Sequence, residues 1–407
     1  MTKLRTYCIV CLFSAAAVIA SPAQNVFFTS LASFDGTNGA GPGYYMSLAQ
    51  GSNGGIYGTA AYGGGYFDTC QYPPGCGTVF TVTLAGALTT LHTFDLSDGA
   101  HPQAGLLQGT DGNFYGTTSG GGGYGWGTVF KITLSGTLTT LYSFCAQPRC
   151  ADGVWPYAGL VQGSDGNFYG TTRDSGANGN GGTVFRITPN GTLTTLYSFC
   201  SQRNCPDGMY PGALVQANDG NFYGTTIEGG SNNSGTIFRI TLSGELLTLH
   251  SFDGSDGVIP YAGLVQANDG SLYGITRDGG DYGWGTVFKI TTSGVLTTLH
   301  SFDGSDGGEA YATLVQANDG DLYGTAFYGG TSGNCTYGCG TVFKITLAGA
   351  ITVLHSFDYT DGASPYGGLL QGRDGSFYGT TSQGGAYGNG TVFRLLGPRT
   401  PCATCRP

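Results

Sequence analysis

The sequence predicts an all-β fold, a seven-bladed β-propeller with four antiparallel strands per blade, in which the N-terminal strand completes the last blade. Three observations predict it. Glycine supplies 76 of the 407 residues and aromatic residues make up 13 %, a composition that favours short strands and tight turns over helices. One set of four sequence markers occurs seven times. The first copy carries a strand that the last copy lacks.

The four markers keep one order in every copy. A Gly-Thr-(Val/Ile)-Phe block begins at Gly77, Gly127, Gly182, Gly235, Gly285, Gly340 and Gly390. A Tyr-Gly-(Thr/Ile) block begins at Tyr57, Tyr115, Tyr169, Tyr223, Tyr273, Tyr323 and Tyr378. Seven positions before these tyrosines lie Gln50, Gln108, Gln162, Gln216, Gln266, Gln316 and Gln371. A Leu-x-(Ser/Thr)-Phe block ends at Phe34, Phe94, Phe144, Phe199, Phe252, Phe302 and Phe357. Units of this length built from short strands are typical of propeller blades, so each copy predicts one blade.

The third copy illustrates how one blade is expected to form. Its strands, which we name a to d, are predicted at residues 158–162, 167–171, 183–188 and 193–199. The turn Ser164-Asp165-Gly166 joins strands a and b, and Asp-Gly between apolar strands is a strong hairpin signal. Both faces of strand d carry apolar residues, so the sheet must be covered on both sides, as it would be between neighbouring blades.

The two ends of the chain favour a closed ring over a linear solenoid. The last copy stops after its third strand, at residues 393–396, and the first begins with an unpartnered fourth strand at residues 26–34. Pairing these segments would complete the seventh blade and remove exposed sheet edges. The predicted organisation is a secretory signal peptide (1–23), a single propeller (24–396) and a short Cys-containing tail (397–407).

The connections between strands differ in how far their length varies. The a–b and c–d connections are constant, whereas the spans that contain the b–c loops run from 12 to 20 positions and those that contain the d–a loops from 14 to 18. In an up-and-down blade the b–c and d–a loops emerge on one side, the variable face, and the constant turns form the turn face. Loops on a rigid scaffold carry binding, so we predict that the variable face is the recognition surface. Drift of loop length without function is the alternative.

Ten of the twelve cysteines form close pairs in the sequence. The pairs are Cys70/Cys76, Cys145/Cys150, Cys200/Cys205, Cys335/Cys339 and Cys402/Cys405. An even number of cysteines in an exported chain favours disulfides, each closing a short loop, and four pairs fall in the longest insertions. Zinc ligation is the alternative, although the pairs lie in different copies. The last pair, separated by two residues, also fits a redox-active motif.

The N-terminus predicts export. Lys3 and Arg5 precede an apolar run, and Ala23 places a small residue before an expected cleavage at Gln24; an uncleaved anchor is the alternative. Cleavage leaves 13 basic residues against 25 acidic ones, a net charge of −12 that opposes binding to nucleic acid or anionic membranes. We expect a secreted, periplasmic or extracellular monomer without a membrane span after signal cleavage.

Aromatic residues gather next to the loops of the variable face. They are Trp126 and Trp284 before strand c, Trp155, Tyr157, Tyr261 and Tyr366 before strand a, and Tyr44 and Tyr45 in the first copy. Flat amphipathic rings in these places would stack on sugar rings or anchor a protein partner. Burial between blades is the alternative.

Carboxylates are the other candidate binding groups. Asp174, Glu228 and Asp278 recur at one position in successive b–c loops, and Glu309 lies in a d–a loop. Paired carboxylates are what glycoside cleavage requires, but solvated loop acids are the simpler interpretation. We therefore predict no catalytic residue.

Histidines and the remaining loop aspartates favour structural roles. His92, His250, His300 and His355 share one repeat position with two tyrosines, which indicates packing. Loop aspartates such as Asp253 and Asp256 are predicted to form Asx turns, with a calcium loop as the alternative. We predict no metal and no cofactor.

The repeat sequence resembles a known family. The segments that carry the likeness are Leu141-Tyr-Ser-Phe, Tyr157-Ala-Gly-Leu-Val-Gln-Gly-Ser-Asp-Gly-Asn-Phe-Tyr-Gly-Thr-Thr172 and Gly182-Thr-Val-Phe-Arg-Ile-Thr. They resemble the GloVer tandem repeat of exported bacterial proteins termed choice-of-anchor, and the likeness covers residues 27–396. The resemblance implies bacterial export and a surface role, with no established activity or catalytic residues. The tail after Leu396 contains no hydrophobic anchor, so we expect release or periplasmic residence.

These observations together predict a non-catalytic protein that recognises carbohydrate or protein through its disulfide-closed variable face. The candidate binding residues are Trp126, Trp155, Tyr157, Tyr261, Trp284, Tyr366, Asp174, Glu228 and Asp278. A polysaccharide hydrolase or lyase on a propeller scaffold is the second hypothesis, because one fold hosts many functions. A structural cell-surface repeat protein is the third.

Overall fold

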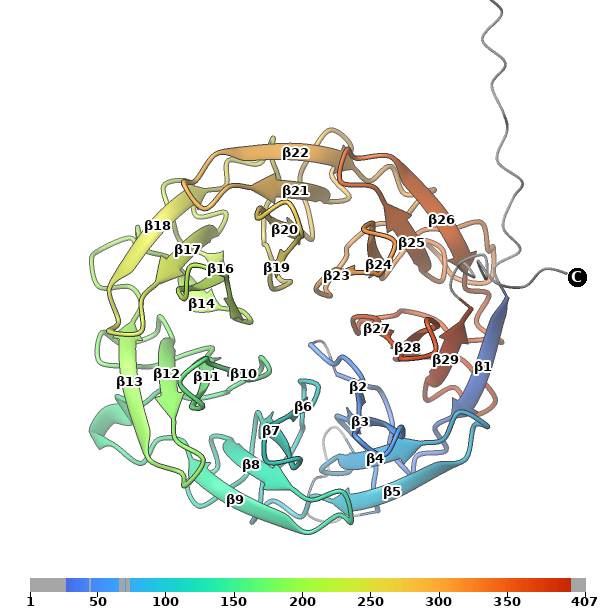
Figure 1. Ribbon diagram of the computed structural model, residues 1–407, viewed down its shortest axis with the longest axis horizontal. Coiled ribbons are helices and arrows are strands. Elements are labelled where there is room, and N and C mark those ends of the chain that lie inside the picture. Colours follow the sequence, from blue (N-terminus) through green and yellow to red (C-terminus); the bar gives the residue numbers. More distant parts are fainter. Residues whose placement is uncertain (1–26, 44, 66–69, 71–73, 397–407) are drawn as a thin grey trace, which may run out of the picture.

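The computed structural model describes residues 27–43, 45–65, 70 and 74–396, and it arranges them as seven antiparallel sheets around a central axis (Figure 1). The structure confirms the all-β, seven-bladed propeller. The chain passes round the ring once, and within each blade the strands follow one another from the axis outwards. Within the described ranges a single 3-10 turn, Pro148–Cys150, is the one helical element.

Blades 1 to 3 have the predicted four strands. Blade 1 comprises β2 (Ala49–Gln50), β3 (Ile56–Ala60), β4 (Thr78–Val82) and β5 (Leu88–Thr93). Blade 2 comprises β6 (Leu107–Gln108), β7 (Phe114–Thr118), β8 (Thr128–Ile132) and β9 (Leu138–Ser143). Blade 3 comprises β10 (Val161–Gln162), β11 (Phe168–Thr172), β12 (Thr183–Ile187) and β13 (Leu193–Ser198).

Blades 4 to 6 repeat this pattern, and blade 4 carries one additional short strand. Blade 4 comprises β14 (Met209–Pro211), β15 (Val215–Gln216), β16 (Phe222–Glu228), β17 (Thr236–Ile240) and β18 (Leu246–Ser251). Blade 5 comprises β19 (Val265–Gln266), β20 (Leu272–Ile275), β21 (Thr286–Ile290) and β22 (Leu296–Ser301). Blade 6 comprises β23 (Val315–Gln316), β24 (Leu322–Ala326), β25 (Thr341–Ile345) and β26 (Ile351–Ser356).

Blade 7 combines both ends of the propeller. It comprises β27 (Leu370–Gln371), β28 (Phe377–Thr381), β29 (Thr391–Leu395) and, as its outer strand, β1 (Phe28–Ser33). Phe28 of β1 lies opposite Leu395 of β29, and its ring stacks on His355 of blade 6 at a centroid distance of 3.7 Å. The predicted ring closure is therefore confirmed, and the linear solenoid is wrong.

Two strand details differ from the prediction. The innermost strand is shorter than residues 158–162, because the carbonyl of Ala158 accepts a hydrogen bond from Thr117 Oγ1 of blade 2 at 3.0 Å instead of pairing within its own sheet. The outer strand contains a β-bulge, since Val184 lies opposite Tyr197 and Phe185 opposite Thr195. The extra residue, Leu196, packs against the cluster between blades 3 and 4. Both changes serve contacts between blades.

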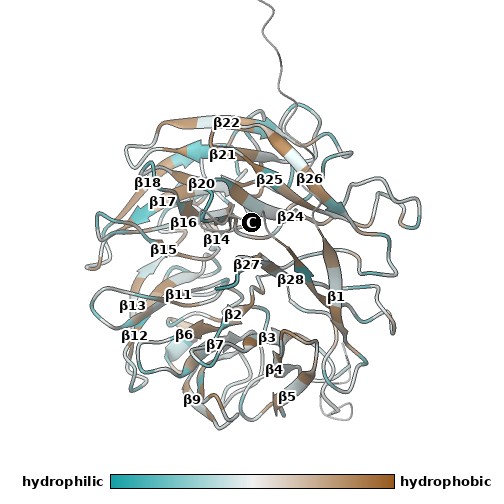
Figure 2. Ribbon diagram, turned by 45° about the vertical axis from the view of Figure 1, so that its right-hand side comes forward, coloured by the Kyte–Doolittle hydropathy of each residue, from teal (hydrophilic) through white to brown (hydrophobic). Residues whose placement is uncertain are grey.

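The hydrophobic core is divided among the interfaces between blades. The buried apolar residues form seven clusters, each built from two neighbouring blades. Figure 2 shows the hydrophobic colour gathered along the strands. In the cluster between blades 3 and 4, the ring of Tyr169 in β11 packs at a tilt against that of Phe222 in β16, with the centroids 4.2 Å apart. Each blade therefore buries its apolar surface against its neighbours.

Close packing inside the blade explains the Tyr-Gly-Thr marker. A Cβ atom on Gly170 would lie 2.7 Å from Cζ of Phe185 and 2.9 Å from Cδ2 of Leu160, too close for any other residue. The hydroxyl of Tyr169 donates to Asp165 in the a–b turn at 2.9 Å. This bond confirms that the Asp-Gly turns of the turn face are structural.

The repeated glutamines join neighbouring blades on the turn face. Gln266 Nε2 donates to the carbonyl of Gly270 in its own a–b turn at 2.9 Å, and its Oε1 accepts from the N–H of Asn218 in blade 4 at 2.8 Å. Gln50 Oε1 accepts in the same way from the N–H of Arg373 at 2.9 Å, across the closure of the ring. The repeated glutamines thus satisfy backbone groups of two neighbouring blades.

Several predictions concern residues that lie outside the described part of the chain. These are the signal peptide (1–23), the tail (397–407), Cys402 and Cys405, and Tyr44. Within the described segments, the structure contains no helix of the length and apolarity needed to cross a membrane.

Removal of one of the repeated glutamines should lower the stability of the fold measurably. Gln266→Ala removes hydrogen bonds to two backbone groups, so we expect the free energy of unfolding to fall by about 1–2 kcal/mol in denaturant titrations. Gln202→Ala changes an exposed glutamine of a d–a loop and should alter it by less than about 0.5 kcal/mol. Equal effects of the two substitutions on the free energy of unfolding would contradict the role of the repeated glutamines in joining neighbouring blades.

The buried tyrosines should make the fold sensitive to alkali. Burial, followed by the hydrogen bond to a turn aspartate, raises the pKa of Tyr169, Tyr223 and Tyr378 to about 12. Between pH 10 and about 12 the unfolded chain releases these protons while the folded chain keeps them, so stability falls as the pH rises. Tyrosinate absorbance and circular dichroism should therefore change together in that window. A titration centred near pH 10 with unchanged dichroism would refute the prediction.

Candidate functional site

The two kinds of variable loop lie together on one side of the ring, as predicted. β-Bridges join the d–a loop to the b–c loop within six blades, and in blade 4 β14 pairs with β16. The bridged pairs are Ala40–Tyr62, Ala100–Gly120, Val154–Asp174, Val258–Asp278, Gly308–Tyr328 and Ala363–Gln383. These contacts define the variable face as one continuous layer of loops.

Seven backbone positions tie this layer together. In each d–a loop one residue adopts a left-handed backbone, with φ between 47° and 59°, at Gly41, His101, Trp155, Tyr210, Ile259, Glu309 and Ser364. Its N–H donates to a carbonyl of the preceding blade at 2.8–3.0 Å. Six of the seven carry a side chain, for which this conformation costs about 1 kcal/mol or more. The interblade hydrogen bond holds each strained residue in place.

Just beyond these strained positions the chain brings tyrosines to the axis. Tyr45 of blade 1 stacks on Tyr261 of blade 5, with ring centroids 5.3 Å apart. Tyr261 contacts Tyr311 of blade 6 edge-on at 5.3 Å, and Tyr311 contacts Tyr366 of blade 7 at 4.9 Å. All four rings are half-buried, and burial raises the pKa of Tyr45 well above its ordinary value. Rings from four blades therefore meet at the centre of the variable face.

Arg173 completes this arrangement from the b–c loop of blade 3. Its Nη1 donates to Tyr261 Oη at 3.1 Å, and its guanidinium lies 5.4 Å from the ring centroids of both Tyr157 and Tyr210. Burial opposes the charge of Arg173, but the oxygens of Tyr261 and Tyr45 outweigh it and raise its pKa. We name these residues the axial cluster: Tyr45, Tyr157, Arg173, Tyr210, Tyr261, Tyr311 and Tyr366.

The predicted carboxylates fall into two groups at the edge of the axial cluster. Burial and then the charges of Asp174 and Glu228 raise the pKa of Tyr210, so both acids flank this ring. Asp278 is paired with Arg277, whose Nε and Nη2 donate to its Oδ2 at 2.9 and 2.5 Å. These acids surround the axis without forming a cluster of their own.

Two pockets open beside the axial cluster. A pocket of about 310 Å³ follows the axis, lined by Tyr45, Tyr311 and the inner strands of several blades. A second, of about 350 Å³, lies between blades 7 and 1, and Tyr366, Gln103, Gln383 and Asn389 are among its lining residues. Tyr366 contacts Tyr311, so the two pockets are neighbours. Gln103 Oε1 is buried without a hydrogen-bond partner among the described residues.

The predicted aromatic residues are distributed between the axis and the rim. Tyr157, Tyr261 and Tyr366 belong to the axial cluster. Trp126 and Trp155 form a separate pair, 5.4 Å between ring centroids, in which Trp126 is 39 % exposed. Trp284 packs over Gly308 of the next blade, where a Cβ would lie 2.7 Å from its ring. Trp284 is thus partly buried between blades 5 and 6, which agrees in part with the alternative of burial between blades.

Sequence reasoning missed Arg173, Tyr210, Tyr311 and a set of rim tyrosines. Tyr311 occupies the same position, five residues before the glutamine marker, as Tyr157, Tyr261 and Tyr366, so the repeat alignment alone identifies it. The rim residues are exposed tyrosines three positions before Gly-Thr, namely Tyr124, Tyr282, Tyr337 and Tyr387.

A recurring hydrogen bond between a histidine and an aspartate anchors four of the d–a loops. His250 Nε2 lies 2.6 Å from Asp256 Oδ2, and the same pair recurs in three other blades. Asp253 Oδ1 accepts from the N–H and hydroxyl of Ser255 at 3.0 and 2.7 Å, which is the predicted Asx turn. The histidine column is therefore structural. No group of three or more His, Cys, Asp or Glu side chains suited to a metal ion occurs among the residues that the structure describes.

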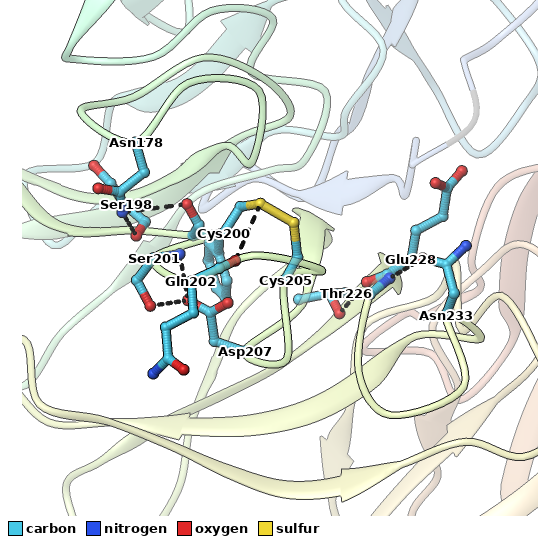
Figure 3. The surroundings of a disulfide bond; sticks show 12 residues. Asn178, Ser198, Cys200, Ser201, Gln202, Cys205, Asp207, Thr226, Glu228 and Asn233 are labelled. Atoms are coloured by element: carbon cyan, nitrogen blue, oxygen red, sulfur yellow. Dashed lines mark hydrogen bonds between the residues drawn. A yellow bond between two sulfur atoms is a disulfide. The ribbon is translucent and has the colours of Figure 1, made fainter.

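Disulfides replace this turn in the two longest d–a loops. Cys145 is bonded to Cys150 and Cys200 to Cys205, while Cys70–Cys76 and Cys335–Cys339 close b–c loops. Figure 3 shows the blade-4 loop, where Asp207 Oδ2 accepts from the N–H and hydroxyl of Ser201 at 3.1 and 2.8 Å. Tyr197 donates to the same oxygen at 2.8 Å. The structure confirms the four predicted disulfides that lie within the described residues.

A family model described as the Gloeobacter/Verrucomicrobia repeat matches residues 71–269 and 210–401. No curated protein matches the sequence. The extracellular domain of a proposed hybrid two-component system from B. thetaiotaomicron is similar in structure, with a TM-score of 0.56 and 9 % identity over 93 % of this chain and 45 % of that one. A gluconolactonase from Xanthomonas campestris is more distant, with a TM-score of 0.45 and 13 % identity over 74 % and 88 % of the two chains. At these identities the similarity shows the fold alone.

Opening one disulfide should expose its loop to protease without affecting the matching loop. Arg203 lies inside the Cys200–Cys205 loop and Arg149 inside Cys145–Cys150, and both are exposed. Closing so short a loop is worth about 2 kcal/mol of chain entropy. In the Cys200→Ser/Cys205→Ser variant we expect trypsin to cleave after Arg203 at least about tenfold faster, as followed by mass spectrometry. Cleavage after Arg149 is the internal control, and an unchanged ratio of the two rates would contradict the prediction.

Proposed function

This chain belongs to the Gloeobacter/Verrucomicrobia repeat family, and from that premise we propose that it is an exported, non-catalytic recognition protein that binds carbohydrate at the axial cluster. The observation that carries the proposal is the convergence of tyrosine rings from several blades around Arg173 at the axis. Each ring presents a flat apolar face and a hydroxyl, the combination that suits a sugar ring with its polar edge.

The size of the site favours a small ring-shaped ligand over a protein. Pockets of about 310 and 350 Å³ lie within the range of small-ligand sites, and a saccharide could extend from one into the other past Tyr366. A stable protein interface instead buries about 800 Å² on each partner. The amide side chains of Gln383 and Asn389 in the second pocket add hydrogen-bonding groups for hydroxyls.

Rigid presentation supports binding as the purpose of the cluster. Tyr157 and Tyr210 follow the two disulfide-closed d–a loops, and the strained backbone at Trp155 and Tyr210 fixes the chain beside them. A site that is ordered before the ligand arrives loses less entropy on binding. Strained backbone of this kind occurs preferentially at functional sites.

The surroundings of the loop acids favour binding over hydrolysis. Asp278 is held by Arg277, and the Asp174 carboxylate accepts a hydrogen bond from the N–H of Ser175. Glycoside cleavage needs one carboxylic acid and one carboxylate facing each other across the bond. A polysaccharide hydrolase or lyase therefore remains the second hypothesis, distinguished by turnover of any saccharide that binds.

Export and a monomeric state belong to the same proposal. Disulfides persist in oxidising compartments outside the cytosol, and four of them close loops on this propeller. The closed ring of sheets also leaves no blade without a neighbour, which supports a chain that functions as a single copy.

Replacing one axial ring should weaken binding. Screening the purified protein on a glycan array should identify at least one saccharide ligand, and Tyr261→Ala should raise its dissociation constant about tenfold or more through loss of ring stacking. Calorimetry measures the change. Tyr282→Ala is the matched control, because Tyr282 belongs to the same blade but is 65 % exposed at a loop tip.

The outcomes separate the hypotheses. A ligand that binds and is cleaved favours the enzyme, whereas binding that Tyr261→Ala and Tyr282→Ala weaken equally places the site away from the axis. A protein that binds no saccharide at all would refute the proposal and favour a structural surface role.

A further inference from the structure

We propose, as a refinement that rests on the carbohydrate-binding function above, that the axial cluster selects a saccharide carrying a carboxylate, a uronate, and that Arg173 binds this carboxylate. The chain is acidic, with 25 Asp and Glu against 15 Lys and Arg. Arg173 is half-buried at the axis of the ring, and none of the ion pairs among the described residues includes it.

A second Arg-Asp dipeptide in the same chain can be compared directly with Arg173-Asp174. Arg173-Asp174 and Arg277-Asp278 occupy the same position in the b–c loops of blades 3 and 5. In blade 5 the carboxylate of Asp278 neutralises its own arginine. In blade 3 the Asp174 carboxylate is turned to the N–H of Ser175, and Arg173 reaches Tyr261 instead. One sequence pattern thus gives one arginine in an ion pair and, at the axis, one arginine without an ion pair.

The contacts of Arg173 leave it suited to a carboxylate. Among the described residues its guanidinium has one hydrogen-bond acceptor, Tyr261 Oη, whereas an arginine offers five N–H donors. A planar carboxylate accepts two parallel hydrogen bonds from such a group. Tyr157 and Tyr210 lie beside the same guanidinium and would hold the sugar ring that carries the carboxylate.

The surrounding acids limit how much negative charge the ligand can carry. Asp174 and Glu228 flank Tyr210, and Glu309 accepts a hydrogen bond from Tyr311 at 3.1 Å. A phosphate or sulfate-rich ligand would bring further negative charge close to these carboxylates and would be repelled. A single carboxylate on each bound sugar matches the one guanidinium of the axial cluster.

Matched saccharides test this selectivity directly. Pairs that differ at one carbon are glucuronate and glucose, galacturonate and galactose, and mannuronate and mannose, each used as short oligosaccharides with the full-length protein. We expect at least one uronate oligosaccharide to bind about tenfold or more tightly than its neutral counterpart. Inorganic phosphate is the third probe and should not compete with it.

Variants of two arginines complete the experiment. Arg173→Gln should remove the preference for the uronate while the melting temperature stays near that of the parent protein, and Arg173→Lys should retain part of it. Arg373→Gln is the control, because it removes the same charge from an exposed position in an a–b turn on the opposite face. It should leave the preference unchanged.

The outcomes distinguish failure of the uronate proposal from failure of carbohydrate binding as a whole. Binding of neutral and acidic partners with equal affinity, unaffected by Arg173→Gln, would overturn the uronate proposal and leave carbohydrate binding standing. Competition by phosphate would show a general anion site and would also overturn it. If no saccharide of the panel binds, both this inference and the proposed function fail.

Discussion

The whole molecule depends on the interface between neighbouring blades. A single four-stranded sheet cannot bury both of its faces, and here the apolar residues lie in seven clusters that are each shared by two blades. Every interface must therefore form, including the one between blades 7 and 1, where β1 pairs with β29 and Gln50 bonds to Arg373. Closure supplies a partner for every sheet face.

The same interface also fixes the residues that surround the axis of the ring. On the turn face, short constant turns and the glutamine bridges join the blades. On the variable face, strained residues such as Trp155 donate their N–H groups to the preceding blade, and in four of the seven d–a loops the residue two positions further on is a tyrosine of the axial cluster. The loops can vary in length towards their tips, because these hydrogen bonds hold the end of each d–a loop that leads into the inner strand.

The fold could be predicted from the sequence because seven copies of the markers average out the ambiguity of any single strand. The length of the innermost strand could not be predicted, since the carbonyl of Ala158 accepts a hydrogen bond from Thr117 of another blade and no local sequence signal marks this contact. The axial cluster was predicted in part, through Tyr45, Tyr157, Tyr261 and Tyr366. Arg173 was missed, because an arginine followed by an aspartate looks in the sequence like an ordinary ion pair. Only the fold shows that the Arg173 side chain bonds to Tyr261 and the Asp174 carboxylate to the N–H of Ser175.

The placement of the disulfides connects these features. Four of the d–a loops are anchored by an Asx turn and a His–Asp pair, and no disulfide closes them. The two d–a loops closed by disulfides precede Tyr157 and Tyr210, whose ring centroids each lie 5.4 Å from the Arg173 guanidinium. Two of the four disulfides among the described residues thus restrain loops that lead into the axial cluster beside Arg173. Closing these two loops covalently limits the positions that Tyr157 and Tyr210 can take relative to the Arg173 guanidinium, so the chain itself orders this part of the axial cluster.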